Sequence, residues 1–146
     1  MPLTENSLHA IIYVSSATKH YSSYELSQLI SPFKTLWKET KLSGLVIYAN
    51  GNGLTLLEGE REAVEKQYEQ NKSHPGHHGI IKLFDRSIQQ RYFEDYVFAL
   101  KVINSSEIKS IDDFESVENT EFWQEYLSMT DDPIVNIIKD FMRYNS

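Results

Sequence analysis

The sequence contains no cysteine. That absence excludes disulfide bonds, thiol catalysis and metal sites built from thiolates. The chain also lacks any apolar run of the roughly 20 residues that a membrane crossing requires. Its first ten residues have no basic region followed by an apolar core, so the sequence predicts no secretory signal. We therefore expect a cytoplasmic protein that does not bind a membrane.

Basic residues are in the minority, with 14 Lys and Arg against 21 Asp and Glu and a net charge of −7. An acidic surface repels a phosphate backbone, which argues against a nucleic-acid partner. The 146 residues fit one domain. Nine Tyr, seven Phe and two Trp make aromatic residues abundant. Many of these will be core, but a pocket for a flat ring or a protein-binding surface would use the same residues.

Hydrophobic patterning predicts an alternation of strands and helices over the first hundred residues. Strand patterns occupy 8–15, 45–49, 53–57, 80–84 and 96–103, and helix patterns occupy 22–37 and 60–70. Pro32 either kinks the first helix or begins a second segment of it. The order is β-α-β-β-α-β with an added strand, which predicts an α+β, ferredoxin-like sheet with two helices on one face.

The C-terminal part predicts two more helices, TEFWQEYLSM at 120–129 and a second one that begins with Asp132 as cap and Pro133 at its first position. An apolar stripe in the second helix follows helical spacing and consists of Ile134, Ile137, Ile138, Phe141 and Met142. We expect both helices to pack on the open face of the sheet, so that 104–146 is an extension of the domain formed by 1–103. Part of the stripe could instead contact another subunit.

No catalytic motif emerges from the residues, and we expect no enzyme. The loop 74-HPGHH-78 gathers three imidazoles, but its spacing matches no established metal site and no carboxylates flank it. A nucleophile elbow, a P-loop and the dinucleotide-binding glycine pattern are all lacking. Glu58, Glu60 and Glu62 are explained as acids that complement a helix N-terminus. What remains is Tyr13, which lies on the same face of the first strand as Ser15. Thr55, on another strand, is a further candidate for that face of the sheet.

The sequence resembles the BLUF family, blue-light sensors that use FAD. The matching pieces are IYVS (12–15), LSGLVIY (42–48), GLTLLEG (53–59), HPGHHGIIKL (74–83) and RYFEDYVFAL (91–100). The resemblance makes 1–103 a BLUF-like domain. It implies a flavin ring between the two sheet-covering helices. An asparagine holds this ring, and a first-strand tyrosine acts on it through a glutamine whose amide can rearrange.

Carried over residue by residue, the resemblance matches Tyr13 to the family tyrosine and His77 to the family histidine. Other pocket positions depart from the family. Thr55 stands for the glutamine, Trp37 for the ring-holding asparagine and Gly76 for an arginine, while Tyr96 and Phe98 occupy the relay positions. Threonine is too short to bridge a tyrosine and a flavin edge, and an indole N–H cannot accept as an amide carbonyl does.

These departures predict a BLUF-fold regulatory domain that is photochemically silent, binds FAD weakly or not at all, and acts through protein–protein interaction. We expect a homo-oligomer and a further protein partner, not identified by the sequence. The alternative is an FAD-binding blue-light photoreceptor with altered photochemistry.

Overall fold

The structure is a computed structural model, and it describes residues 8–17, 23–49, 51–75, 77–93, 99–103, 115–116 and 132–144. Within these residues one mixed sheet has the strand order β4-β1-β3-β2-β5-β6. The strands are β1 (Leu8–Ala17), β2 (Ser43–Ala49), β3 (Asn52–Glu60), β4 (His77–Ile88), β5 (Ala99–Ile103) and β6 (Glu115–Ser116). β1 lies between β3 and β4 and is antiparallel to both, whereas β5 runs parallel to β2. The predicted ferredoxin-like α+β arrangement is confirmed.

Several strand boundaries differ from those predicted. β4 begins at His77 and ends at Ile88, so it is more than twice as long as the segment 80–84 that its apolar residues indicated. His77 and His78 were assigned to a loop, which was wrong, because they pair with Ala17 and Ser16 of β1. The short strand β6 was not predicted. Residues 96–98 of the expected last strand lie outside the described part, and β5 begins at Ala99.

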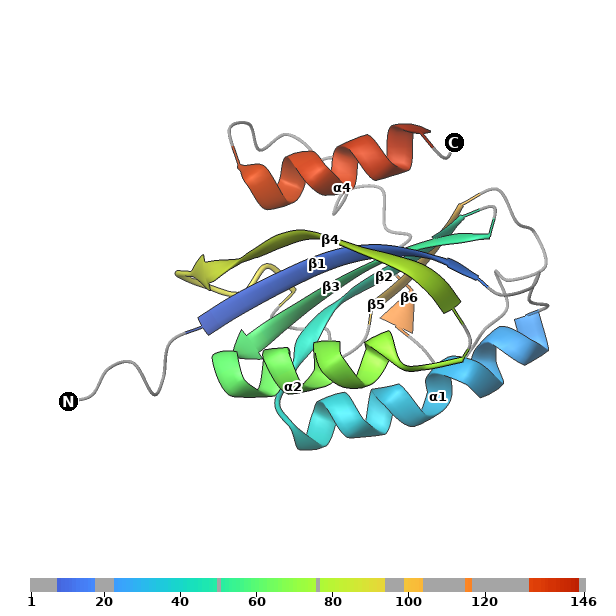
Figure 1. The fold of residues 1–146 in the computed structure, drawn as a ribbon, viewed down its shortest axis with the longest axis horizontal. Helices are drawn as coiled ribbons and strands as arrows, with labels where there is room; N and C mark the ends of the chain where they lie inside the picture. Colours follow the sequence, from blue (N-terminus) through green and yellow to red (C-terminus); the bar gives the residue numbers. More distant parts are fainter. Residues whose placement is uncertain are drawn as a thin grey trace.

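Two helices cover one face of the sheet (Figure 1), as predicted. Helix α1 (Ser23–Glu39) continues through the exposed Pro32 as a single helix, and α2 (Arg61–Lys72) follows directly after β3. We call this face the α2 side. Between these helices and the sheet lies one buried cluster, formed by Ile11, Tyr13, Trp37, Leu42, Tyr48, Leu57, Val64 and Tyr68. No helix in the described ranges combines the length and apolar character needed to cross a membrane.

Helix α4 (Pro133–Tyr144) covers the opposite face, which we call the α4 side (Figure 1). Asp132 caps this helix as predicted, since its Oδ1 accepts the backbone N–H groups of Ile134 and Val135 at 2.9 and 3.2 Å. The apolar stripe closes the core of its own domain, together with β-strand residues such as Ile12, Leu54 and Leu56. The helix expected at 120–129 lies outside the described residues.

Candidate functional site

The candidate site is centred on Tyr13 of β1. The Tyr13 side chain points to the α2 side and is only 3% exposed. Thr55 is its direct partner in the register with β3, and the two side chains are hydrogen-bonded. The expectation that Tyr13 and Thr55 share a face is therefore met. The ring of Tyr13 packs against the rings of Tyr68 and His77, with centroids 5.5 and 6.2 Å away.

Two amide side chains on α2 complete the surroundings of Tyr13. Asn71 Nδ2 donates to the Tyr13 hydroxyl at 2.9 Å, and Gln67 Nε2 donates to Asn71 Oδ1 at 2.7 Å. Both amides are buried, at 6% and 3% exposure. Because Gln67 and Asn71 are four residues apart, they lie one turn above each other on the same helix face. An amide therefore does contact the first-strand tyrosine, but it comes from a helix and not from the neighbouring strand.

Burial raises the pKa of the Tyr13 phenol, and the nearby Tyr68 raises it further, while the hydrogen bonds with Thr55 and Asn71 act in the opposite direction. A buried phenolate without a cation beside it is costly. Tyr13 is consequently a neutral hydroxyl at physiological pH, able both to accept from Asn71 and to donate.

His77 extends the network to the start of β4. Its Nε2 donates to the backbone carbonyl of Asn71 at 2.5 Å, and its Nδ1 lies 3.1 Å from Ser15 Oγ. With the proton on Nε2, Nδ1 accepts from the serine hydroxyl, so the histidine is held in one orientation. His77 thus satisfies a carbonyl at the end of α2. The ring of its neighbour His74 packs at a tilt against Phe33 of α1, and burial together with the nearby His77 lowers the pKa of His74.

Trp37 lies in the last turn of α1 and is buried to 1% exposure within the α2-side cluster. Its indole therefore points inward, which settles the orientation that the sequence left open. Gly44 on β2 lies next to the indole. A Cβ atom at residue 44 would lie 3.4 Å from Trp37 Cζ3 and 1.9 Å from the carbonyl oxygen of Leu56, and the φ of Gly44 is +151°. The indole lies against bare backbone, where a side chain would otherwise stand.

A second buried network ties the end of β3 to the segment after β4. Glu58 is fully buried, and its carboxylate accepts the backbone N–H groups of Tyr92 at 2.8 Å and Phe93 at 2.6 Å and the Ser43 hydroxyl at 2.9 Å. Burial raises the pKa of this carboxyl. The helix-dipole explanation was thus wrong for Glu58, which precedes α2 and anchors a loop instead. Arg91 donates to Ser43 Oγ and to the Lys41 carbonyl, and strengthens the same junction.

The residues on the α2 side do not fit a flavin of the kind that the resemblance implies. Trp37 and Tyr68 occupy the buried space beside Tyr13, and the Tyr13 hydroxyl already bonds with Asn71 and Thr55. The Asn71 and Gln67 amides are directed at each other. Within the described residues, the buried polar atoms of this side that have no hydrogen-bond partner include the Tyr48 hydroxyl. A hydroxyl cannot replace the set of donors and acceptors along a flavin edge.

The structure brings together Tyr13, Thr55, Trp37 and His77 from four different elements. Gly76, Tyr96 and Phe98 lie outside the described residues. Gln67 and Asn71 were missed. Their signal was present, because 64, 67, 68 and 71 follow the i, i+3, i+4, i+7 spacing of a buried face, and two of these four positions hold amides. In the described ranges no group of three or more His, Asp or Glu side chains could hold a metal ion.

Comparison with known proteins tests the resemblance on which the sequence-based prediction of the family rests. Residues 8–99 match the family profile BLUF, described as sensors of blue light using FAD. The photoactivated adenylate cyclase subunit beta of Euglena longa is 25% identical over 89 residues, which are 61% of this chain but only 10% of that protein. The chain thus corresponds to about a tenth of this relative's length.

Solved structures agree on the fold. The Klebsiella pneumoniae BlrP1 manganese/cyclic-diGMP complex at pH 6 superposes with a TM-score of 0.73 at 17% identity, covering 93% of this chain and 33% of that one. The photo-activated state of BlsA gives 0.65 at 18% identity and covers 94% of both chains. The dark state of BlrB gives 0.63 at 17% identity, with 67% and 74% covered. Since the family profile spans most of the chain and these structures share its fold, the protein belongs to the BLUF family.

Proposed function

We propose that this BLUF-family domain works as a regulatory module that is photochemically silent, binds flavin weakly or not at all, and acts through protein–protein contacts. The observation that supports this most is the closed arrangement around Tyr13. The indole of Trp37 fills buried space on the α2 side that a flavin would need. The amides of Gln67 and Asn71 bond with each other and with Tyr13, so these groups are not available to a flavin.

The energetic cost of admitting a flavin follows from this arrangement. A ring entering the α2 side would displace Trp37 from a position with 1% exposure and would break the Asn71 contact with Tyr13. Each buried polar group left unpaired costs about 1–3 kcal/mol. Two such losses reduce affinity by about a hundredfold or more, since 1.4 kcal/mol corresponds to about tenfold.

Purified full-length protein tests the proposal directly. We expect no flavin absorption band after gel filtration, and no retention of added FAD or FMN in equilibrium dialysis. A flavin that stays bound through gel filtration contradicts the flavin-free form of the proposal. A reversible red shift of its band under blue light contradicts photochemical silence as well.

A gain-of-function variant tests the assignment of the two pocket positions. Trp37→Asn combined with Thr55→Gln restores the amides of the family pattern and is expected to raise flavin affinity by about a hundredfold. The matched control is Trp37→Phe with Thr55→Val, which alters the same positions without adding an amide and leaves affinity at the parent level. Circular dichroism verifies that both variants fold. Equal affinity of the folded restoring variant and its control shows that these positions do not govern flavin binding.

The alternative, an FAD-binding receptor with altered photochemistry, is favoured by one contact. Tyr13 lies within hydrogen-bond distance of an amide, that of Asn71, and the resemblance implies a tyrosine next to an amide in a working photoreceptor. The absorption measurement separates the two functions, because only the receptor retains flavin.

A further inference from the structure

Strand β4 forms one edge of the sheet. Among the described strands it pairs only with β1, along its full length from His77 to Ile88. The other side of an edge strand presents a row of backbone N–H and C=O groups that can pair with another chain. At 12 residues, β4 is the longest strand of the sheet and offers a long row of this kind.

Apolar side chains are exposed on the same strand. Ile81 is 59% exposed and Leu83 is 45% exposed. The remaining large exposed hydrophobic residue in the described part is Tyr144 near the end of α4. Native edge strands ordinarily avoid such side chains, because apolar groups beside unpaired backbone promote strand addition. Ile81 and Leu83 therefore place exposed apolar surface on the strand whose outer backbone groups are unpaired among the described strands.

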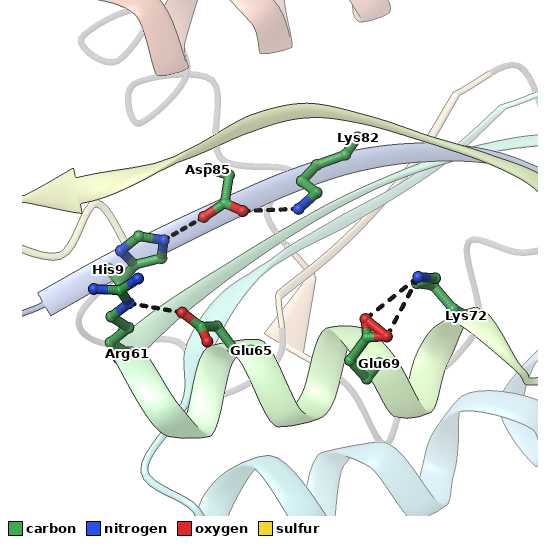
Figure 2. A network of polar contacts seen from close by, with 7 residues as sticks. All are labelled: His9, Arg61, Glu65, Glu69, Lys72, Lys82 and Asp85. Carbon is green, nitrogen blue, oxygen red and sulfur yellow. Dashed lines mark hydrogen bonds and ion pairs between the residues drawn. The ribbon is translucent and has the colours of Figure 1, made fainter.

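Two residues of opposite charge, Lys82 and Asp85, lie on either side of Leu83 and Phe84 in β4. Lys82 Nζ lies 2.8 Å from Asp85 Oδ2, and the other oxygen of Asp85 contacts His9. Figure 2 shows the Asp85 carboxylate between His9 and the Lys82 ammonium. Lys82 also lies 4.9 Å from the ring centroid of Tyr68 on α2. Lys82 and Asp85 are therefore both on the α2 side of the strand.

A register shift in β4 makes this arrangement symmetric. Ile12 pairs with Phe84 and Tyr13 pairs with Lys82, so Leu83 is an extra residue. The extra residue reverses the alternation of faces. As a result, Ile81 and Arg86 share the α4 side in the same way that Lys82 and Asp85 share the α2 side.

We propose that β4 pairs antiparallel with β4 of a second copy of this chain, about a two-fold axis between Leu83 and Phe84. Lys82 then lies opposite the partner's Asp85, Leu83 opposite the partner's Phe84, and Ile81 opposite the partner's Arg86. In an antiparallel pair, directly opposite residues share a face. Lys82 and Asp85 meet this condition because they pair with Tyr13 and Ile11 of β1, and Ile81 and Arg86 meet it because they pair with Val14 and Ala10. An edge lysine usually opposes strand pairing. Here its counter-charge occupies the symmetry-related position, so no like charges face each other.

The dimer rests on the proposed function in that it identifies a second copy as a protein partner. The dimer is tested by measuring molecular mass and the residues in contact, whereas the proposed function is tested by flavin absorption. The dimer proposal and the proposed function can therefore fail independently. Light scattering after gel filtration of the full chain is expected to give about 34 kDa, twice the 17.0 kDa of one chain. Leu83→Lys is expected to weaken association by at least about tenfold. Tyr144→Lys changes the other large exposed hydrophobic residue of the described part, away from β4, and is expected to leave the mass at that of a dimer.

Because the chain contains no cysteine, single cysteines report the register without interference. In the proposed pairing, two copies of residue 83 have Cα atoms about 6 Å apart, within the range that a disulfide bridges. Two copies of residue 81 are displaced by five residues, or about 16 Å. Mild oxidation is therefore expected to produce a covalent dimer of Leu83→Cys and not of Ile81→Cys.

Three results overturn the proposal. They are a monomeric mass at every protein concentration tested, an oligomer whose mass Leu83→Lys does not change, and equal crosslinking of the two cysteine variants. Circular dichroism of each variant confirms that the fold is retained, and the three substituted residues, Ile81, Leu83 and Tyr144, are exposed enough to accept the change.

Discussion

Replacing Asn71 by leucine removes the contact that distinguishes this site most clearly. The side chain keeps its branching at Cγ but loses its donor and its acceptor. Asn71 Nδ2 no longer donates to the Tyr13 hydroxyl, and Gln67 Nε2 loses the oxygen to which it donates. The backbone carbonyl of residue 71 still accepts from His77, so the end of α2 is unaffected.

The two lost bonds differ in cost. Gln67 is 3% exposed, and its stranded N–H bears the full penalty of a buried donor without an acceptor, about 1–3 kcal/mol. Tyr13 keeps Thr55 as a partner, so its loss is that of one ordinary hydrogen bond, about 0.5–1.5 kcal/mol. The extra apolar surface of leucine offsets part of this sum. We expect Asn71→Leu to lower the free energy of unfolding by about 2 kcal/mol.

A second substitution, at Gln67, tests whether the two amides stabilise the protein as a hydrogen-bonded pair. Gln67→Leu alone leaves Asn71 Oδ1 without its donor, whereas Gln67→Leu with Asn71→Leu removes both members of the pair. Replacing both partners of a buried hydrogen bond by apolar groups is much less costly than replacing one. The double variant should therefore be more stable than Asn71→Leu, although it carries one more mutation.

Urea denaturation followed by circular dichroism and tryptophan fluorescence measures the free energies of unfolding of all three variants. Lys66→Leu, an exposed change on the same helix, is the control and is expected to stay within about 0.5 kcal/mol of the parent. A double variant that loses as much free energy of unfolding as the two single variants together would show that Gln67 and Asn71 do not stabilise the protein as a hydrogen-bonded pair.

Three further predictions concern the surroundings of this network. Gly44→Ala should destabilise the protein by about 2 kcal/mol or more, because the new Cβ would lie 1.9 Å from the Leu56 carbonyl oxygen at a φ of +151°; an unchanged melting temperature would contradict this. Trp37→Ala should cost about 3–5 kcal/mol in urea denaturation and Trp37→Phe clearly less, as expected for a buried side chain that fills the α2 side; a cost below about 1 kcal/mol would mean that the indole is not core. Glu58→Gln should cost about 1–3 kcal/mol, since one of the N–H groups of Tyr92 and Phe93 then faces the amide nitrogen. Burial raises the pKa of Glu58 in the folded state, so the folded protein holds this proton more tightly than the unfolded chain. The parent should therefore lose stability relative to Glu58→Gln as the pH rises from the unfolded pKa of about 4.3 through the raised folded pKa, and a difference that does not vary with pH would refute the shift.

Periodicity was enough to predict the three helices that the structure describes and the central strands. The alternation of Ile11 and Tyr13 with Ile12 and Val14 reflects a strand buried on both sides, and such strands carry a strong apolar signal. The edge strand was harder, because most of β4 is exposed and its polar residues resemble a loop. Pairing with β1 extends β4 to Ile88, and that pairing is a non-local property that no local pattern contains.

The site was predicted only in part, for a similar reason. Tyr13, Thr55 and His77 stand in short segments that resemble a known family, and the structure brings them to one place. Asn71 could not be identified as the partner of Tyr13 from the sequence, since 58 residues separate them. Only the packing of α2 on β1 decides which helix face meets the tyrosine.

The sequence by itself determined the class of fold, the family and the side chains at residues 37 and 55, a tryptophan and a threonine, because these depend on residue identity and local spacing. The tertiary structure decided what surrounds them. It buried Trp37 against Gly44, directed Asn71 to Tyr13, and left Ile81 and Leu83 exposed beside the unpaired side of β4. Burial and hydrogen bonding between distant segments are set by the packing of whole elements, and that packing exists only once the chain has folded.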